Sequence, residues 1–145
     1  MIKQFEKLTK EEATLLFKAP ALVSVLAASG NHQINEKEKA DAIKLSHIKE
    51  FSADPMLLNY YSEVEKNFET DFETIVKKYV PFNDTQRNLL KEEINVLNKT
   101  ISLLEPEFAN MLHRSLTRYA QHVKKAERSI VEDFIFPFPI NGLTD

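Results

Sequence analysis

The sequence predicts an all-α protein, a compact single-domain bundle of about six helices, three of them long, with an extended C-terminal tail. Apolar residues recur at steps of three and four over most of the chain, the spacing that places them on one face of a helix. The one clear period-two stretch is residues 134–140, so helices must build the core. With 145 residues, 43% of them hydrophobic and 28% charged, the whole chain, 1–145, is the size of one globular domain.

The start of the chain predicts a polar N-terminal lead, residues 1–8, and then two helical segments in succession. Thr9 and Glu12 have the three-residue spacing of a capping box and mark the beginning of the first helix. Pro20 lacks an N–H group, so we expect it to end this helix and to begin a second one. Residues 21–28 are apolar around almost the whole circumference, which predicts a central, buried segment.

A third helix is expected after a turn at Gly30, the residue that best tolerates a left-handed backbone. Asn35 and Glu38 repeat the capping spacing and begin this helix, which continues to about Phe51. Residues 20–51 therefore predict a helix, a loop and a second helix.

Three long helices follow, each with an unbroken apolar face. Asp54 and Pro55 suit the cap and first position of one helix, Asn83 or Asp84 caps the next, and Pro106 begins the last. The three ranges are 55–79, 85–104 and 106–130. Because the connections are short, we expect antiparallel neighbours that pack together and against segment 20–28.

The composition excludes several classes of protein. The chain has no cysteine and only two glycines, so it has no disulfide framework, thiolate metal site or glycine-rich phosphate loop. Its net charge of -3 argues against a general nucleic-acid binder. No signal peptide or membrane-spanning run is visible, so we expect a cytoplasmic protein without membrane insertion. Because no catalytic motif is present, we expect no enzymatic activity and no cofactor.

Two stretches carry a family resemblance. In residues 21–38 an apolar helix ends at a glycine and is followed by an apolar residue, a capping residue and a glutamate. The residues concerned are Ala28, Gly30, Ile34, Asn35 and Glu38. With the long-helix stretch 106–126, this pattern resembles the tellurite-resistance TerB-like family. The resemblance implies a small helical module of the cytoplasm that acts in a stress response; we expect it to act through contacts with a protein partner.

Two alternatives to this function remain open. The first is a divalent-metal sensor that uses loop 29–38, with Asn35 and Glu38 as oxygen ligands. Ser29 stands where the TerB-like family has a loop aspartate, which weakens the metal interpretation, and helix capping alone accounts for Asn35 and Glu38. The second alternative is an enzyme with an internal cavity in the bundle. Its expected lining is Tyr60, Tyr61, His113 and Tyr119.

Two surfaces are candidates for partner binding. One is a basic face of the last helix, which we expect either to dock an anionic partner or to be an ordinary solvated face. Its residues are Arg114, Arg118, Lys125 and Arg128. The other is the tail 134–145, where Phe134, Phe136 and Phe138 alternate with other residues, while its prolines exclude a central strand. We expect this tail to pack on its own bundle, with a homodimer contact or a partner-binding peptide as the alternatives.

Overall fold

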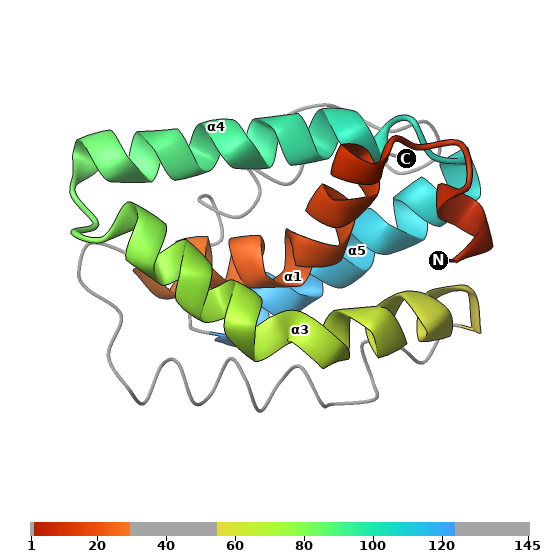
Figure 1. Ribbon diagram of the computed structural model, residues 1–145, viewed down its shortest axis with the longest axis horizontal. Helices are drawn as coiled ribbons and strands as arrows, with labels where there is room; N and C mark the ends of the chain where they lie inside the picture. Colours follow the sequence, from red (N-terminus) through yellow and green to blue (C-terminus); the bar gives the residue numbers. More distant parts are fainter. Residues whose placement is uncertain (1, 30–54, 124–145) are drawn as a thin grey trace.

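The computed structural model describes residues 2–29 and 55–123, and this part of the chain is entirely helical (Figure 1). A 3-10 turn, Lys3–Phe5, precedes four α-helices. The α-helices are α1, Lys10–Ser29, α3, Pro55–Tyr79, α4, Asp84–Ile101, and α5, Pro106–Val123. No strand occurs in the described ranges, which confirms the predicted all-α class.

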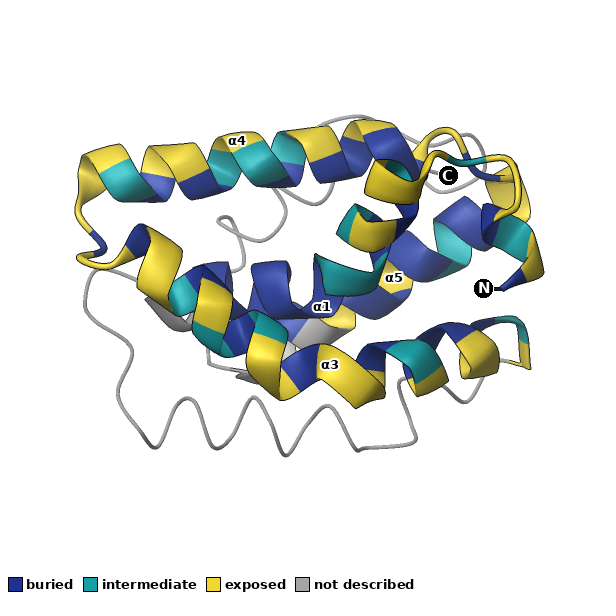
Figure 2. Cartoon of the chain, in the orientation of Figure 1, coloured by how far each residue is buried: buried dark blue, intermediate teal, exposed yellow. Residues whose placement is uncertain are grey.

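Helix α1 is the central element of the bundle. It lies between α3 and α4 with α5 on its far side, and it contacts each of these helices much more extensively than they contact one another (Figure 1). Residues 19–27 are all buried (Figure 2). This confirms the predicted burial of segment 21–28 for residues 21–27, whose side chains the structure describes. Helices α3, α4 and α5 therefore bury their apolar faces mainly against α1 and much less against one another.

Pro20 does not divide α1, contrary to our prediction of two separate helices. A proline at this position removes the N–H group that the Leu16 carbonyl would accept in a regular helix. The Tyr60 hydroxyl of α3 donates to that carbonyl instead, at 2.6 Å. Because Tyr60 of another helix supplies the donor that the Leu16 carbonyl lacks, α1 continues through Pro20 and is 20 residues long.

The helix starts follow the predicted local chemistry. The Thr9 backbone N–H donates to Glu12 Oε1 at 2.8 Å, and the Glu12 N–H donates to Thr9 Oγ1 at 3.1 Å, which completes the capping box. At α4, the Asn83 side chain accepts from the Gln86 N–H at 2.9 Å, so Asn83 and not Asp84 is the cap. Helix α4 ends at Ile101, three residues before the predicted end.

The predicted N-terminal lead contributes Phe5 to the core. Phe5, in the 3-10 turn, is fully buried. Its ring packs against Phe17 of α1, Tyr60 of α3 and Phe108 of α5, with centroid distances of 5.0, 6.0 and 6.0 Å. The polar stretch before α1 therefore contributes one aromatic side chain to the core, which the sequence analysis did not predict.

The predicted number of about six helices is only partly confirmed, since the described residues form four α-helices. The fusion of the first two predicted helices accounts for part of the difference. The predicted helix that ends near Phe51, the last residues of the 106–130 helix and the tail 134–145 lie outside the described residues. No helix in the described part is both long and apolar enough to cross a membrane.

Candidate functional site

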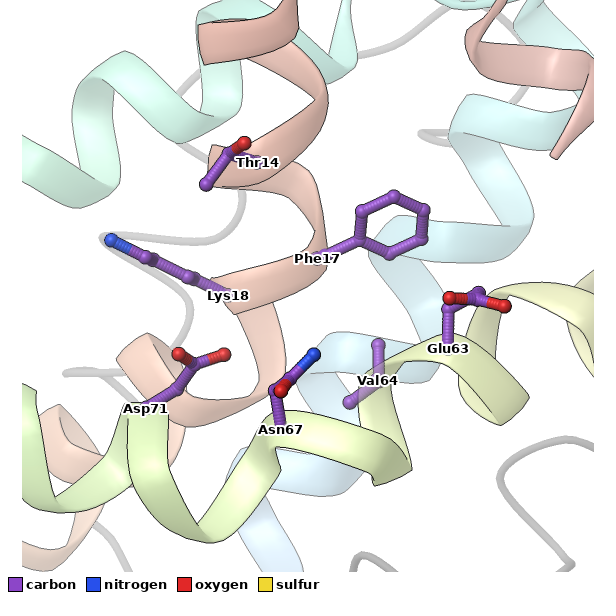
Figure 3. A pocket seen from close by; sticks show the side chains of 7 residues that line it. All are labelled: Thr14, Phe17, Lys18, Glu63, Val64, Asn67 and Asp71. Atoms are coloured by element: carbon purple, nitrogen blue, oxygen red, sulfur yellow. The ribbon is translucent and has the colours of Figure 1, made fainter. Parts of the chain in front are cut away.

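A pocket of about 200 Å³ lies between α1 and α3 (Figure 3). Its α3 side is formed by Glu63, Asn67 and Asp71, which follow one another at four-residue steps and so share one face of the helix. Val64 lies beside them. The α1 side is formed by Thr14, Phe17 and Lys18. The pocket thus lies at the surface of the bundle, where α1 and α3 pack together and polar residues border their buried faces.

Asp71 and Lys18 give the pocket opposite charges at one end (Figure 3). Burial raises the pKa of the Asp71 carboxyl above its ordinary 3.8, because the ionised form loses water. The positive charge of Lys18 lowers this pKa, but by less than burial raises it. The carboxylate is therefore electrostatically undersatisfied, and a further positive charge nearby would stabilise it.

Phe17 forms the aromatic wall of the pocket. Its ring stacks on Tyr60 at a centroid distance of 5.9 Å with an interplanar angle of 18°, and the Phe5 ring packs at 5.0 Å. These rings pack against Phe17 from the core, and the partly buried Phe17 side chain also lines the pocket. The pocket therefore has an aromatic, apolar side next to two carboxylates.

Glu63 closes the opposite end of the pocket. Lys66, one turn further along α3, donates to Glu63 Oε1 at 2.9 Å. This hydrogen bond, and then the charge of Lys66, hold the pKa of Glu63 below its ordinary value. The pair is solvent-exposed, so Lys66 can exchange its partner at little cost.

A shallower hollow of about 370 Å³ continues the pocket along α1. It shares Thr14 and Lys18 with the pocket and extends to Lys10, Glu11 and Leu15. Together the two form one surface, open along the exposed side of α1.

The chemistry of the pocket suits a cationic group. Carboxylates on α3 attract a positive charge, the Asn67 amide oxygen accepts a hydrogen bond, and an aromatic face such as that of Phe17 attracts a cation at close range. A planar guanidinium can use all three kinds of contact at once. The pocket contains no histidine or cysteine and therefore lacks the usual base and thiol nucleophile of covalent catalysis.

The predicted metal and partner-binding residues lie mostly outside the described ranges. Asn35 and Glu38 of the 29–38 loop fall there, as do the tail residues Phe134, Phe136 and Phe138. Of the basic face, Arg114 and Arg118 are exposed one turn apart on α5, whereas Lys125 and Arg128 are not described.

The predicted internal cavity involves residues that are packed into the core. Tyr60 and Tyr61 are buried and hydrogen-bonded, to the Leu16 carbonyl and the Ser115 hydroxyl respectively. Burial raises the pKa of Tyr61, so its phenol is protonated at neutral pH. Burial also lowers the pKa of His113 to about 4, so this imidazole is neutral. The Tyr119 side chain is outside the described structure, and the α1–α3 pocket involves none of the four.

The pocket itself was not predicted from the sequence. Its α3 residues belong to an acidic stretch that the sequence shows as an ordinary charged helix face. The one sign of the pocket in the sequence is that Glu63, Asn67 and Asp71 recur at four-residue steps beside the apolar stripe. The residues that face them lie about 50 positions earlier in the chain, so the sequence does not show that the two sets meet.

Comparison of the chain with protein-family models, with curated proteins and with solved structures gives no significant match. Over residues 2–29 and 55–123, no group of three or more histidine, cysteine, aspartate or glutamate side chains is arranged to hold a metal ion.

Proposed function

We propose that this chain is a non-catalytic helical module that acts by binding another protein, and that the α1–α3 pocket receives a basic side chain of that partner. The observation that carries this proposal is the lining of the pocket, where Glu63, Asn67 and Asp71 share one face of α3 beside Phe17 of α1. Burial also raises the pKa of Asp71 by more than the charge of Lys18 lowers it, which agrees with a site for a further cation. A carboxylate in this state gains more from an incoming cation than a fully hydrated one does.

The remaining lining explains why an arginine or lysine side chain suits the pocket. Its aliphatic stem can lie along Phe17 and Val64 while its charged head lies between the α3 carboxylates. Glu63 and Asp71 are eight residues apart, about 12 Å along the helix axis, with Asn67 midway. One guanidinium can therefore contact Asn67 and one carboxylate at the same time, with the second carboxylate adding a longer-range attraction.

The resemblance to the TerB-like family adds the proposal that the module acts in a stress response. The loop residues on which that resemblance depends, such as Gly30 and Ile34, lie outside the described part of the chain. The metal sensor with Asn35 and Glu38 as ligands remains a separate prediction, which a rise in melting temperature with calcium, magnesium or zinc would support.

The pocket can be tested with a defined cationic probe. We expect N-acetyl-arginine amide, titrated into the isotope-labelled protein, to shift the backbone amide resonances of Thr14, Asn67 and Asp71 with a millimolar dissociation constant, as befits a single side chain. The matched probe N-acetyl-citrulline amide has nearly the same shape without the charge and should bind at least about fivefold more weakly. Equal binding of the two probes would contradict a cation site.

Two variants locate the site. Asp71→Asn removes one pocket carboxylate and should weaken arginine binding by about three- to tenfold, which corresponds to about 0.7–1.4 kcal/mol. Glu69→Gln removes the same charge from an exposed position of α3 that does not line the pocket, and should change binding by less than twofold. Equal effects of the two substitutions would show that general attraction, and not the pocket, binds the probe.

Lys18→Met distinguishes a cation site from a site for a dipolar ligand. A cationic group is repelled by Lys18, so its loss should tighten arginine binding by about two- to fivefold. A ligand that uses Lys18 to hold its own carboxylate, such as a free amino acid, should instead bind more weakly to the variant. That second result would indicate that the pocket binds a small zwitterion and not a side chain of a protein partner.

A further inference from the structure

The outer side of α1 carries a row of polar residues with a charge opposite to that of the row on α3. Lys10, Thr14 and Lys18 follow one another at four-residue steps and so share one face of α1. The hollow beside them is lined by two lysines and one glutamate, whereas the α1–α3 pocket is lined by two carboxylates and one lysine. We call Lys10, Thr14 and Lys18 the α1 row.

The α1 row runs between the pocket and the hollow. Thr14 and Lys18 line both of them, and Figure 3 shows these two side chains on one side of α1 and Phe17 on the other. In helical projection, Phe17 of the pocket lies about 60° to one side of Thr14, and Leu15 of the hollow lies about 100° to the other. Thr14 is the shortest side chain of the row and lies between two long ones. A chain that passes from the pocket to the hollow therefore crosses α1 most easily over Thr14.

The stability of α1 does not account for a lysine at position 10. Lys10 is the first residue of the helix and is exposed. A positive charge in the first turn is unfavourable, because the N-terminal end of the helix dipole is itself positive. Glu11 and Glu12 supply the negative charges that this end of the helix favours. A carboxylate bound over Thr14, in contrast, would give the charge of Lys10 a favourable role.

We propose that the partner binds through an extended segment that crosses α1 over Thr14, with its basic side chain in the pocket and an acidic side chain between Lys10 and Lys18. This inference rests on the proposed function, because the basic side chain is the one that the pocket receives, and it adds the chemistry of the neighbouring residue. Lys10 and Lys18 are eight residues apart, about 12 Å along the axis, so both flexible side chains can approach a carboxylate midway. The Thr14 hydroxyl can donate a hydrogen bond to the same carboxylate.

The spacing of the two partner residues follows from the helix surface. The 60° step from Phe17 to Thr14 is about 5–6 Å at the outer radius of a helix. In an extended segment, side chains two positions apart point to the same side and are about 7 Å apart. The acidic residue is therefore expected two positions before or after the basic one.

A pair of peptides tests the acidic residue on the full chain. The first is acetyl-Ala-Glu-Ala-Arg-Ala-Glu-Ala-amide, which allows either direction of binding, and the second has glutamine in place of both glutamates. We expect the glutamate peptide to bind about two- to fivefold more tightly, measured from the amide resonance of Thr14, because exposed ion pairs contribute little each. General attraction would give the opposite order, since the chain has a net charge of -3 and repels the more acidic peptide.

Two lysine variants locate the acidic side chain. Lys10→Met should reduce the preference for the glutamate peptide to less than about 1.5-fold. Lys7→Met removes the same charge from an exposed lysine that lines neither the pocket nor the hollow, and should keep the preference within about 1.5-fold of its natural value. Lys18 is unsuitable for this comparison, because it attracts the glutamate and repels the arginine at the same time.

The outcomes separate this inference from the proposed function. N-acetyl-arginine amide may bind better than its citrulline analogue while the natural chain shows no preference for the glutamate peptide, or one that Lys10→Met leaves unchanged. Either result would overturn the acidic contact and leave the cation site intact. Equal binding of the arginine and citrulline probes would overturn both.

Discussion

The continuity of α1 through Pro20 depends on one hydrogen bond from another helix, and this dependence can be measured. The Tyr60 hydroxyl donates to the Leu16 carbonyl, which has no helical donor because residue 20 is proline. Tyr60→Phe keeps the ring and its packing but leaves that buried carbonyl without a donor. A buried polar group deprived of its partner costs about 1–3 kcal/mol, and we expect the free energy of unfolding to fall by that amount.

A double-mutant cycle separates this hydrogen bond from other effects of losing the hydroxyl. Pro20→Ala supplies an N–H group at the position where a regular helix donates to the Leu16 carbonyl. In that background Tyr60→Phe leaves the carbonyl satisfied, so its effect should be at least about 1 kcal/mol smaller. The stability of Pro20→Ala itself does not matter, because the cycle compares the same substitution in two backgrounds.

The assay is urea denaturation followed by circular dichroism for the four proteins of the cycle. The slopes of the unfolding transitions should agree, which shows that the variants unfold from the same fold. If Tyr60→Phe has the same effect in both backgrounds, the two residues are uncoupled and the account of Pro20 is wrong.

Three further predictions concern the titratable groups and the caps. Folding lowers the pKa of His113 from 6.5 to about 4, so on acidification the unfolded chain binds a proton at this histidine before the folded chain does. The free energy of unfolding should therefore fall by about 3 kcal/mol between pH 6.5 and pH 4. Chemical denaturation across this pH range should show a weaker dependence for His113→Phe. Folding raises the pKa of Asp71, so its ionised form destabilises the fold. Asp71→Asn should therefore raise the melting temperature at pH 7, and this gain should shrink towards pH 3, where the carboxyl is mostly protonated in both the folded and the unfolded chain. Asn83→Ala removes the α4 cap and should cost about 1 kcal/mol in chemical denaturation, and an unchanged midpoint would contradict the capping role.

Local features of the fold were predictable because their causes are local in the chain. The capping pair Thr9 and Glu12 and the cap Asn83 act within one helical turn, so their residue types and spacing suffice to place the helix starts. The complete burial of the apolar segment 21–28, as far as the structure describes it, follows equally from its own composition.

The features that were predicted wrongly or not at all involve partners distant in sequence. Pro20 ends a helix in isolation, and nothing nearby shows that Tyr60, 40 residues later, supplies an alternative hydrogen bond to α1. Phe5 lies in a polar stretch whose residue types do not indicate a core position, yet aromatic rings of three helices pack against it. Tertiary packing overrides local preference at both places.

The candidate pocket could not be predicted for a related reason. Each of its sides is an ordinary polar helix margin, and its chemistry arises only when Lys18 and Asp71 are brought together by the packing of α1 on α3. The undersatisfied charge of Asp71 is likewise a property of burial, which residue type alone does not determine.

The pKa of Asp71, followed by carbon NMR of its carboxyl group, tests the proposed cation site most directly. In the free protein we expect a value above 3.8. Saturation with N-acetyl-arginine amide should lower this value, because a bound cation favours the ionised carboxylate, whereas N-acetyl-citrulline amide should leave it nearly unchanged. A pKa at or below 3.8 in the free protein, or one that the arginine probe does not lower, would contradict the account.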